Sequence, residues 1–198
     1  VYKRQVPVRV VAAGRPDSVR VELEGTQARY PLPSRWEVVE VDPACDLFRR
    51  LHRSEVPVAL SQVLGAERSA AVIGADVDAP LAEALFAVAR QWAENQDMVV
   101  SAEADFQDDG RRSLWLLGDG PLARRIRERV ESYGTAPADL VQRAEVEERS
   151  AVLALPDPEE PERAFALVLP QDAAAAAALG RKLPHYGRYG YLLFAGER

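Results

Sequence analysis

The chain has very few of the residues that metal and nucleophilic chemistry require. Its 198 residues include one cysteine, Cys45, and two histidines, His52 and His185. A single thiol excludes an intrachain disulfide and a cysteine-based zinc site. The two histidines lie far apart in the sequence, and neither is part of a His-Glu-x-x-His pattern. We therefore interpret both as surface or hydrogen-bonding residues and expect no metal ligand in this chain.

The usual patterns of nucleophilic catalysis are also missing. The sequence contains no Gly-x-Ser-x-Gly turn for a serine nucleophile. Cys45 and His52 lie on one expected helix, but about two helical turns separate them, which is too far for contact. We predict no catalytic residue here.

Long apolar runs and a basic surface are absent as well. No apolar run approaches the roughly 18 residues of a membrane-spanning helix, so we expect no membrane span. Residues 1–69 hold 11 Lys and Arg against 9 Asp and Glu, and residues 70–198 hold 14 against 22. This acidic second part disfavours nucleic acid as a partner, because such binding requires a basic face.

Lysine is scarce, with two residues against 23 arginines, a bias typical of a GC-rich genome. Lys3 lies in Val1-Tyr2-Lys3-Arg4-Gln5, which resembles the translated end of a sequencing-library transposon. The alternative is a genuine edge strand that begins at Val1. In either case we expect the natural N-terminus to be missing, so the sequence assigns no compartment.

Residues 1–41 have the period-two pattern of half-buried strands, in which valines alternate with polar residues. Residues 14–17 supply a turn. The expected strands are 6–10, 19–23, 28–32 and 36–41. Four short antiparallel strands with one wet face are typical of half a β-sandwich, so we expect its partner sheet upstream.

Residues 42–68 are expected to form a helical connector packed between two modules. Leu47, Phe48 and Leu51 have helical spacing within residues 45–53, Pro57 interrupts, and residues 59–64 add a turn. The alternative, a solvated linker, is disfavoured because these apolar side chains need burial.

From residue 69 onward, buried apolar runs alternate with helical patterns. The expected strands are 70–73, 98–101, 114–117, 151–155, 165–169 and 191–194, and the expected helices are 80–92, 122–130 and 172–183. Residues 156–161 predict a hairpin-like connection. This pattern indicates a mainly parallel sheet. The predicted fold class is therefore α/β: a short antiparallel β-sandwich remnant, followed by a mainly parallel α/β sandwich domain over residues 69–198.

Two segments are candidate binding sites. In Gly118-Asp119-Gly120-Pro121, the backbone N–H groups of Gly118 and Gly120 at a helix start could hold an anion. A plain tight turn is the favoured interpretation, because Asp119 would repel phosphate. In the closing segment, residues 183–191, the side chains of His185, Tyr186, Arg188 and Tyr189 form either a ligand pocket or a packing clamp. The clamp is favoured.

Both ends of the sequence resemble a known family. Val39-Glu40-Val41-Asp42-Pro43, Asp46-Leu47-Phe48-Arg49-Arg50-Leu51 and Glu55-Val56-Pro57 resemble the end of the β-sandwich in bacterial proteins of the aminopeptidase N-like zinc metallopeptidase family. Lys182-Leu183-Pro184-His185-Tyr186-Gly187-Arg188-Tyr189-Gly190-Tyr191 is similar to a C-terminal segment of the same proteins. The resemblance implies a parent that removes N-terminal residues from peptides with a zinc-bound water. No residue here matches the zinc motif, so no catalytic or metal residue is carried over.

The leading hypothesis is therefore a non-catalytic C-terminal accessory region of a metallopeptidase-like bacterial protein. Its expected partner is the upstream catalytic domain, which would hold the zinc, and no cofactor is expected in this fragment. A periplasmic or secreted parent is compatible with the family. One alternative is a small-molecule or peptide-binding α/β module with a crevice near Gly74, Gly118 and Pro156. The other is a structural docking or dimerisation domain.

Overall fold

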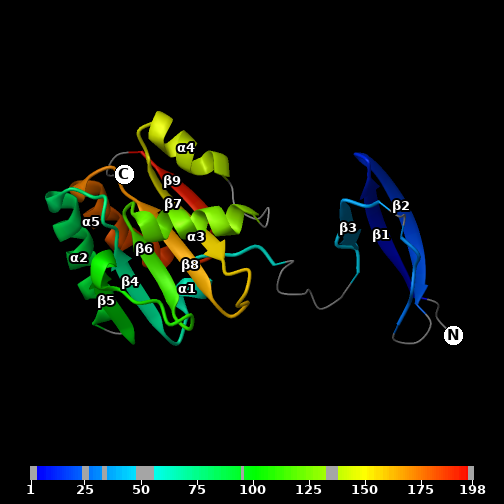
Figure 1. The fold of residues 1–198 in the computed structure, drawn as a ribbon, viewed down its shortest axis with the longest axis horizontal. Helices are drawn as coiled ribbons and strands as arrows, with labels where there is room; N and C mark the ends of the chain where they lie inside the picture. Colours follow the sequence, from blue (N-terminus) through cyan, green and yellow to red (C-terminus); the bar gives the residue numbers. More distant parts are fainter. Residues whose placement is uncertain are drawn as a thin grey trace. The chain divides into compact units, whose positions relative to one another are not determined.

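The computed structural model describes residues 4–23, 27–32, 35–47, 56–94, 96–132 and 138–195. It divides the chain into two compact units, Val1–His52 and Arg53–Arg198 (Figure 1). The first contains a three-stranded antiparallel sheet, and the second contains a six-stranded, mostly parallel sheet with helices. The predicted α/β fold class is confirmed.

The sheet of the first unit is built on one long hairpin. Strands β1 (Arg4–Ala12) and β2 (Arg15–Leu23) pair in antiparallel register, and β3 (Val38–Val41) pairs with the other side of β1. Ala13 and Gly14 form the two-residue loop with φ of 50° and 70°, as the right-handed twist of a hairpin favours. The loop is shorter than the predicted turn over 14–17, since Arg15 already begins β2.

The expected strand at residues 28–32 is not one. These residues have no regular secondary structure, although Gln27 makes an isolated bridge. Pro31 has no N–H to donate to a ladder, which outweighs the alternating pattern around Tyr30. The described part of this unit therefore has three strands, where the sequence predicted four.

One face of this sheet is lined by valines. In the register, Val8 lies opposite Val19 on β2 and Val41 on β3, and the other face carries Arg9 opposite Ser18 and Glu40. Val8 is 9% exposed and Val10 is 4% exposed, whereas Val41 is 45% exposed. We call this the valine face; it consists of Val6, Val8, Val10, Val19, Val21, Val39 and Val41. The predicted division into an apolar and a wet face is confirmed.

The second half of the expected connector belongs to the core of the second unit. Helix α1 (Ser61–Leu64) confirms the predicted extra turn, and Leu60 and Val63 are fully buried. The helix expected over 45–53 is wrong in its described part, because residues 45–47 are not helical. Cys45, the first residue of the expected helix, has a φ of 54°, and Asp42 just before it has a φ of 55°. Helices exclude this conformation. The remainder, with His52, lies outside the described residues.

The six-stranded sheet has the order β5-β4-β6-β8-β7-β9. Its strands are β4 (Ser69–Ile73), β5 (Met98–Ala102), β6 (Ser113–Leu117), β7 (Ser150–Pro156), β8 (Ala164–Leu169) and β9 (Tyr191–Phe194). Strands β5, β4, β6 and β8 are parallel, whereas β7 is antiparallel to both β8 and β9. The predicted hairpin connection between β7 and β8 is confirmed.

Helices cover both faces of this sheet. One core contains residues of α1, α2 (Ala79–Ala93) and α5 (Ala173–Lys182), and the other contains residues of α3 (Pro121–Ser132) and α4 (Ala138–Val146). The Asp78 and Asp172 carboxylates accept from the N–H groups of Leu81 and Ala175 and so cap α2 and α5. The helix predicted over 172–183 is confirmed as α5, and α4 was not anticipated.

Candidate functional site

The sequence predicted a crevice at the topological switch point of this sheet, which lies between the carboxyl ends of β4 and β6. These strands are parallel neighbours, and the helices that follow them, α2 and α3, pack on opposite faces. After these two strands the chain therefore continues on opposite faces of the sheet. Open α/β sheets bind ligands at such a point. Gly74 follows β4 and Gly118 follows β6, and the Gly74 N–H donates to the Leu117 carbonyl at 2.9 Å. Two of the three positions named from the sequence thus lie together.

The third position, Pro156, lies at the other end of the sheet. It is paired with Ala164, at the start of β8, because β7 runs antiparallel to its neighbours. The hairpin that contains Pro156 is fixed by a buried arginine, Arg163, which is 6% exposed. Arg163 donates to the Asp157 carboxylate at 3.2 Å and to the Asp108 carboxylate at 2.5 Å. This end of the sheet is therefore closed by ion pairs.

The anion at the start of α3 is supplied by the protein itself. The Glu103 carboxylate accepts from the Ala75 N–H at 2.9 Å and from the Leu122 N–H. Glu103 lies just beyond the end of β5 in a short 3₁₀ turn, Glu103–Asp105. A carboxylate at a helix N-terminus satisfies unpaired N–H groups and interacts favourably with the helix dipole. The anion site predicted at Gly118 and Gly120 stays a prediction, with Glu103 beside Gly120.

An arginine joins the two loops at this switch point. The Arg124 guanidinium binds the Asp119 carboxylate at 2.6 Å and also the Asp76 carboxylate. These hydrogen bonds, that to Asp76 first, raise the pKa of Arg124. The Arg124 cation and the carboxylates of Asp76, Asp119 and Glu103 therefore lie on the loops that follow β4, β5 and β6. Sequence analysis missed Glu103 and Arg124, although the position of Glu103 directly after a buried strand was a usable signal.

The aromatic rings of the closing segment pack against one another. The Tyr186 ring contacts the Phe194 ring edge-on at 5.8 Å and the Tyr189 ring at 5.6 Å. Arg188 lies over the Tyr189 ring at 5.2 Å and donates to its hydroxyl at 3.1 Å. His185 is exposed and stands apart from these ring contacts. The cluster named from the sequence is therefore brought together except for His185.

The same segment binds the connector through its backbone. The N–H groups of Leu60 and Ser61 donate to the carbonyls of Tyr189 and Gly187 at 2.9 and 2.7 Å. Because Leu60 is completely buried, these bonds hold the start of α1 against the sheet margin. The choice between a packing clamp and a ligand pocket stays a prediction.

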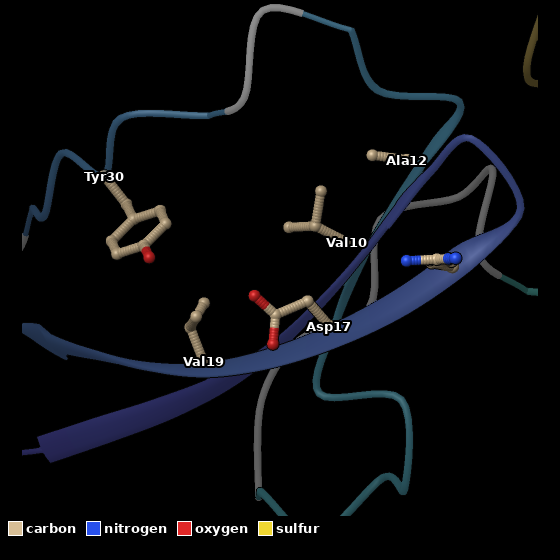
Figure 2. A pocket seen from close by; sticks show the side chains of 6 residues that line it. Val10, Ala12, Asp17, Val19 and Tyr30 are labelled. Carbon is tan, nitrogen blue, oxygen red and sulfur yellow. The ribbon is translucent and has the colours of Figure 1, made fainter.

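A shallow hollow of about 230 Å³ lies on the first unit, over the valine face (Figure 2). Val10 and Val19 point into it from the sheet, and Tyr30 lies across from them on a separate segment. Arg15 and Asp17 complete the lining. Its walls are mainly apolar, so the hollow can take an apolar side chain.

No protein-family model matches the chain, and no curated protein matches it at a significant level. Within the described residues, no helix is long and apolar enough to cross a membrane. Over the same residues, no group of three or more His, Cys, Asp and Glu side chains is arranged to hold a metal ion. Cys45 is a free, exposed thiol.

Proposed function

We propose that this chain is a non-catalytic C-terminal accessory region of an aminopeptidase N-like zinc metallopeptidase. Residues 6–41 would complete a β-sandwich with strands of the upstream part, and the second unit would serve as an accessory α/β domain. The zinc and the hydrolytic residues would belong to the upstream catalytic domain, which is the expected partner.

The observation that carries this proposal is a contact next to one of the stretches that resemble the family. The residues directly after Glu55-Val56-Pro57 contact the closing stretch: the Leu60 N–H donates to the Tyr189 carbonyl, and Val58 lies close to Gly190. The two stretches are more than a hundred residues apart in the sequence. This contact gives a physical reason for both to be present in one protein.

The valine face supports the placement beside an upstream sheet. Partly exposed valines leave apolar surface of this face in water, and covering that surface with a second sheet is favourable. In an aligned sandwich a second sheet covers such a face about 10 Å away. Val41 and other partly exposed valines would then be buried, and the hollow at Val10 and Tyr30 would receive a side chain.

The first test is genetic and enzymatic. The reading frame upstream of this chain is expected to contain His-Glu-x-x-His with a downstream Glu, and the longer protein is expected to hydrolyse leucine p-nitroanilide. The 198-residue chain is expected to have no such activity when supplied with zinc. A complete reading frame without the zinc motif, or turnover by the chain alone, would contradict the proposal.

A second test uses a matched pair of substitutions on the two faces of β2. Val19→Asp places a charge on the valine face, and Ser18→Asp places it on the wet face. In the longer protein, burial of the new charge should make Val19→Asp cost about 2 kcal/mol or more, whereas Ser18→Asp should cost little. In the 198-residue chain both should cost little. An equal loss for Val19→Asp in both contexts would show that no upstream sheet covers the face.

A further inference from the structure

The outer edge of β9 has a row of backbone groups that point away from the sheet. The Ala154 N–H donates to the Gly190 carbonyl at 2.7 Å, so these opposed residues form a hydrogen-bonded pair. In an antiparallel ladder hydrogen-bonded and non-hydrogen-bonded pairs alternate. Tyr191 and Leu193 therefore direct their N–H and C=O groups outward, and β9 is the last strand of the sheet. In the part of the chain that the structure describes, no other backbone group pairs with these two residues.

At the start of this row, one outward-pointing backbone group already has a hydrogen-bond partner. Tyr189 has the same alternation as Tyr191, and its carbonyl accepts from the Leu60 N–H at 2.9 Å. The connector thus pairs with the edge for a short distance, next to Gly190. Beyond this point Tyr191 is 59% exposed. The edge is accessible there and has the geometry that an added strand requires.

Basic residues flank this edge in an otherwise acidic unit. Residues 173–195 contain no Asp or Glu, and neither does the neighbouring strand β7. Arg188, beside Tyr189 at the start of β9, is exposed, and no carboxylate of the described residues forms an ion pair with it. Lys182 lies over the Phe194 ring at 5.8 Å, so a positive charge stands at the far end of β9 as well. We call Lys182, Arg188 and strand β9 the basic edge.

We propose that the basic edge binds an acidic, extended peptide segment as an additional strand. The outward groups of Tyr191 and Leu193 pair with its backbone, which provides binding that is independent of side chains. Successive side chains of the added strand point to opposite faces. Acidic side chains on the α5 face meet Lys182, and apolar side chains on the α4 face lie beside Tyr191 and Leu193. Charge selects the partner, because a basic or neutral strand gains nothing from Lys182 and Arg188.

The test uses the 198-residue chain and a fluorescein-labelled hexapeptide, Glu-Val-Glu-Val-Glu-Val, followed by fluorescence anisotropy. We expect saturable binding that weakens as salt is added. The same peptide with N-methyl groups on alternate residues lacks the backbone N–H donors along one edge. It should bind about tenfold more weakly. A Lys-Val peptide of the same length should not bind.

Substitutions locate the site. Arg188→Gln should weaken the acidic peptide about threefold, and Lys182→Gln with Arg188→Gln about tenfold. The matched control is Arg125→Gln, which removes an exposed charge from α3 and should leave binding unchanged. Arg125 and Arg188 are exposed and Lys182 is half-buried, so the variants are expected to fold.

Three results would overturn the proposal. The first is equal binding of the N-methylated peptide, since that would mean attraction of charge without strand pairing. The second is equal loss for Arg125→Gln and Arg188→Gln. The third is binding of a single-stranded oligothymidylate as tight as that of the peptide, which would identify a general anion surface. The proposal does not depend on the parent enzyme, because its outcome is the same whatever lies upstream.

Discussion

A Cβ atom at Gly190 would lie 2.6 Å from the carbonyl oxygen of Val58. This close approach joins the closing segment to the connector by backbone alone, and only glycine permits it. The contact explains why a residue with no side chain stands between two tyrosines at this margin.

Gly190→Ala should therefore destabilise the chain. The methyl group would meet a backbone oxygen that cannot rotate away, so we expect a loss of about 1–3 kcal/mol in the free energy of unfolding by urea. Gly187→Ala is the matched control, because a Cβ there would meet Leu64 and Ser61 at an ordinary 3.5 Å. Equal losses for the two variants would mean that the clamp is loose at Gly190.

Glu103→Ala should loosen the start of α3. The substitution leaves the N–H groups of Ala75 and Leu122 without their acceptor, and we expect a loss of about 1–2 kcal/mol. Asp105→Ala, in the same turn but exposed, should change the midpoint of thermal unfolding very little. If only Asp105→Ala lowered the stability, the proposed capping role of Glu103 would be wrong.

Arg163→Ala should be among the most damaging single changes in the second unit. It removes one partner of the buried Asp157 carboxylate, which is 6% exposed, and also the cation that lies 4.8 Å from the Phe165 ring. Breaking a buried pair costs about 3 kcal/mol or more. Arg143→Ala breaks the exposed pair with Glu147 and should cost at most about 0.5 kcal/mol. Urea unfolding of both variants provides the comparison.

Asp109 should make folding stability depend on acid pH. The hydrogen bond from the Arg111 N–H is the largest cause that lowers the pKa of this carboxyl. A carboxyl whose folded pKa is lowered contributes stability above its unfolded pKa and loses it as the pH falls through the folded value. The difference in stability between the wild type and Asp109→Asn should therefore be present at pH 7 and vanish below the folded pKa. A titration by carboxyl carbon NMR measures that pKa, and a peptide of residues 106–112 gives the unfolded reference. A folded pKa equal to that of the peptide would contradict the prediction.

The alternation of short apolar strands with helices was sufficient to locate most of the second unit. Strand β6 and helix α2, for example, fall within one or two residues of their predicted limits. Strand direction was not accessible in the same way. A strand buried on both faces, such as β7, has the same composition whether it runs parallel or antiparallel to its neighbours. The position of Pro156 at the wrong end of the sheet follows from this.

The sequence predicted the members of the closing cluster and offered a clamp as one of two roles, but it did not predict their partners. The Tyr186 ring contacts Phe194, and the Tyr189 carbonyl accepts from the Leu60 N–H, so the cluster depends on residues from three elements. The switch point between β4 and β6 was predicted from Gly74, Gly118 and Pro156, of which Pro156 lies elsewhere. Its charged residues come from separate loops, and only the parallel order of the strands brings Glu103 to the start of α3.

The burial of Leu60 and Val63 has a practical consequence for anyone who dissects this chain. A piece that starts at Ser69 would lack two side chains from the middle of its hydrophobic interior, and the resulting voids would weaken it. It would also leave the carbonyls of Gly187 and Tyr189 without their donors. A cut placed ahead of Val56 keeps the interior filled and is the natural starting point for crystallising the second unit.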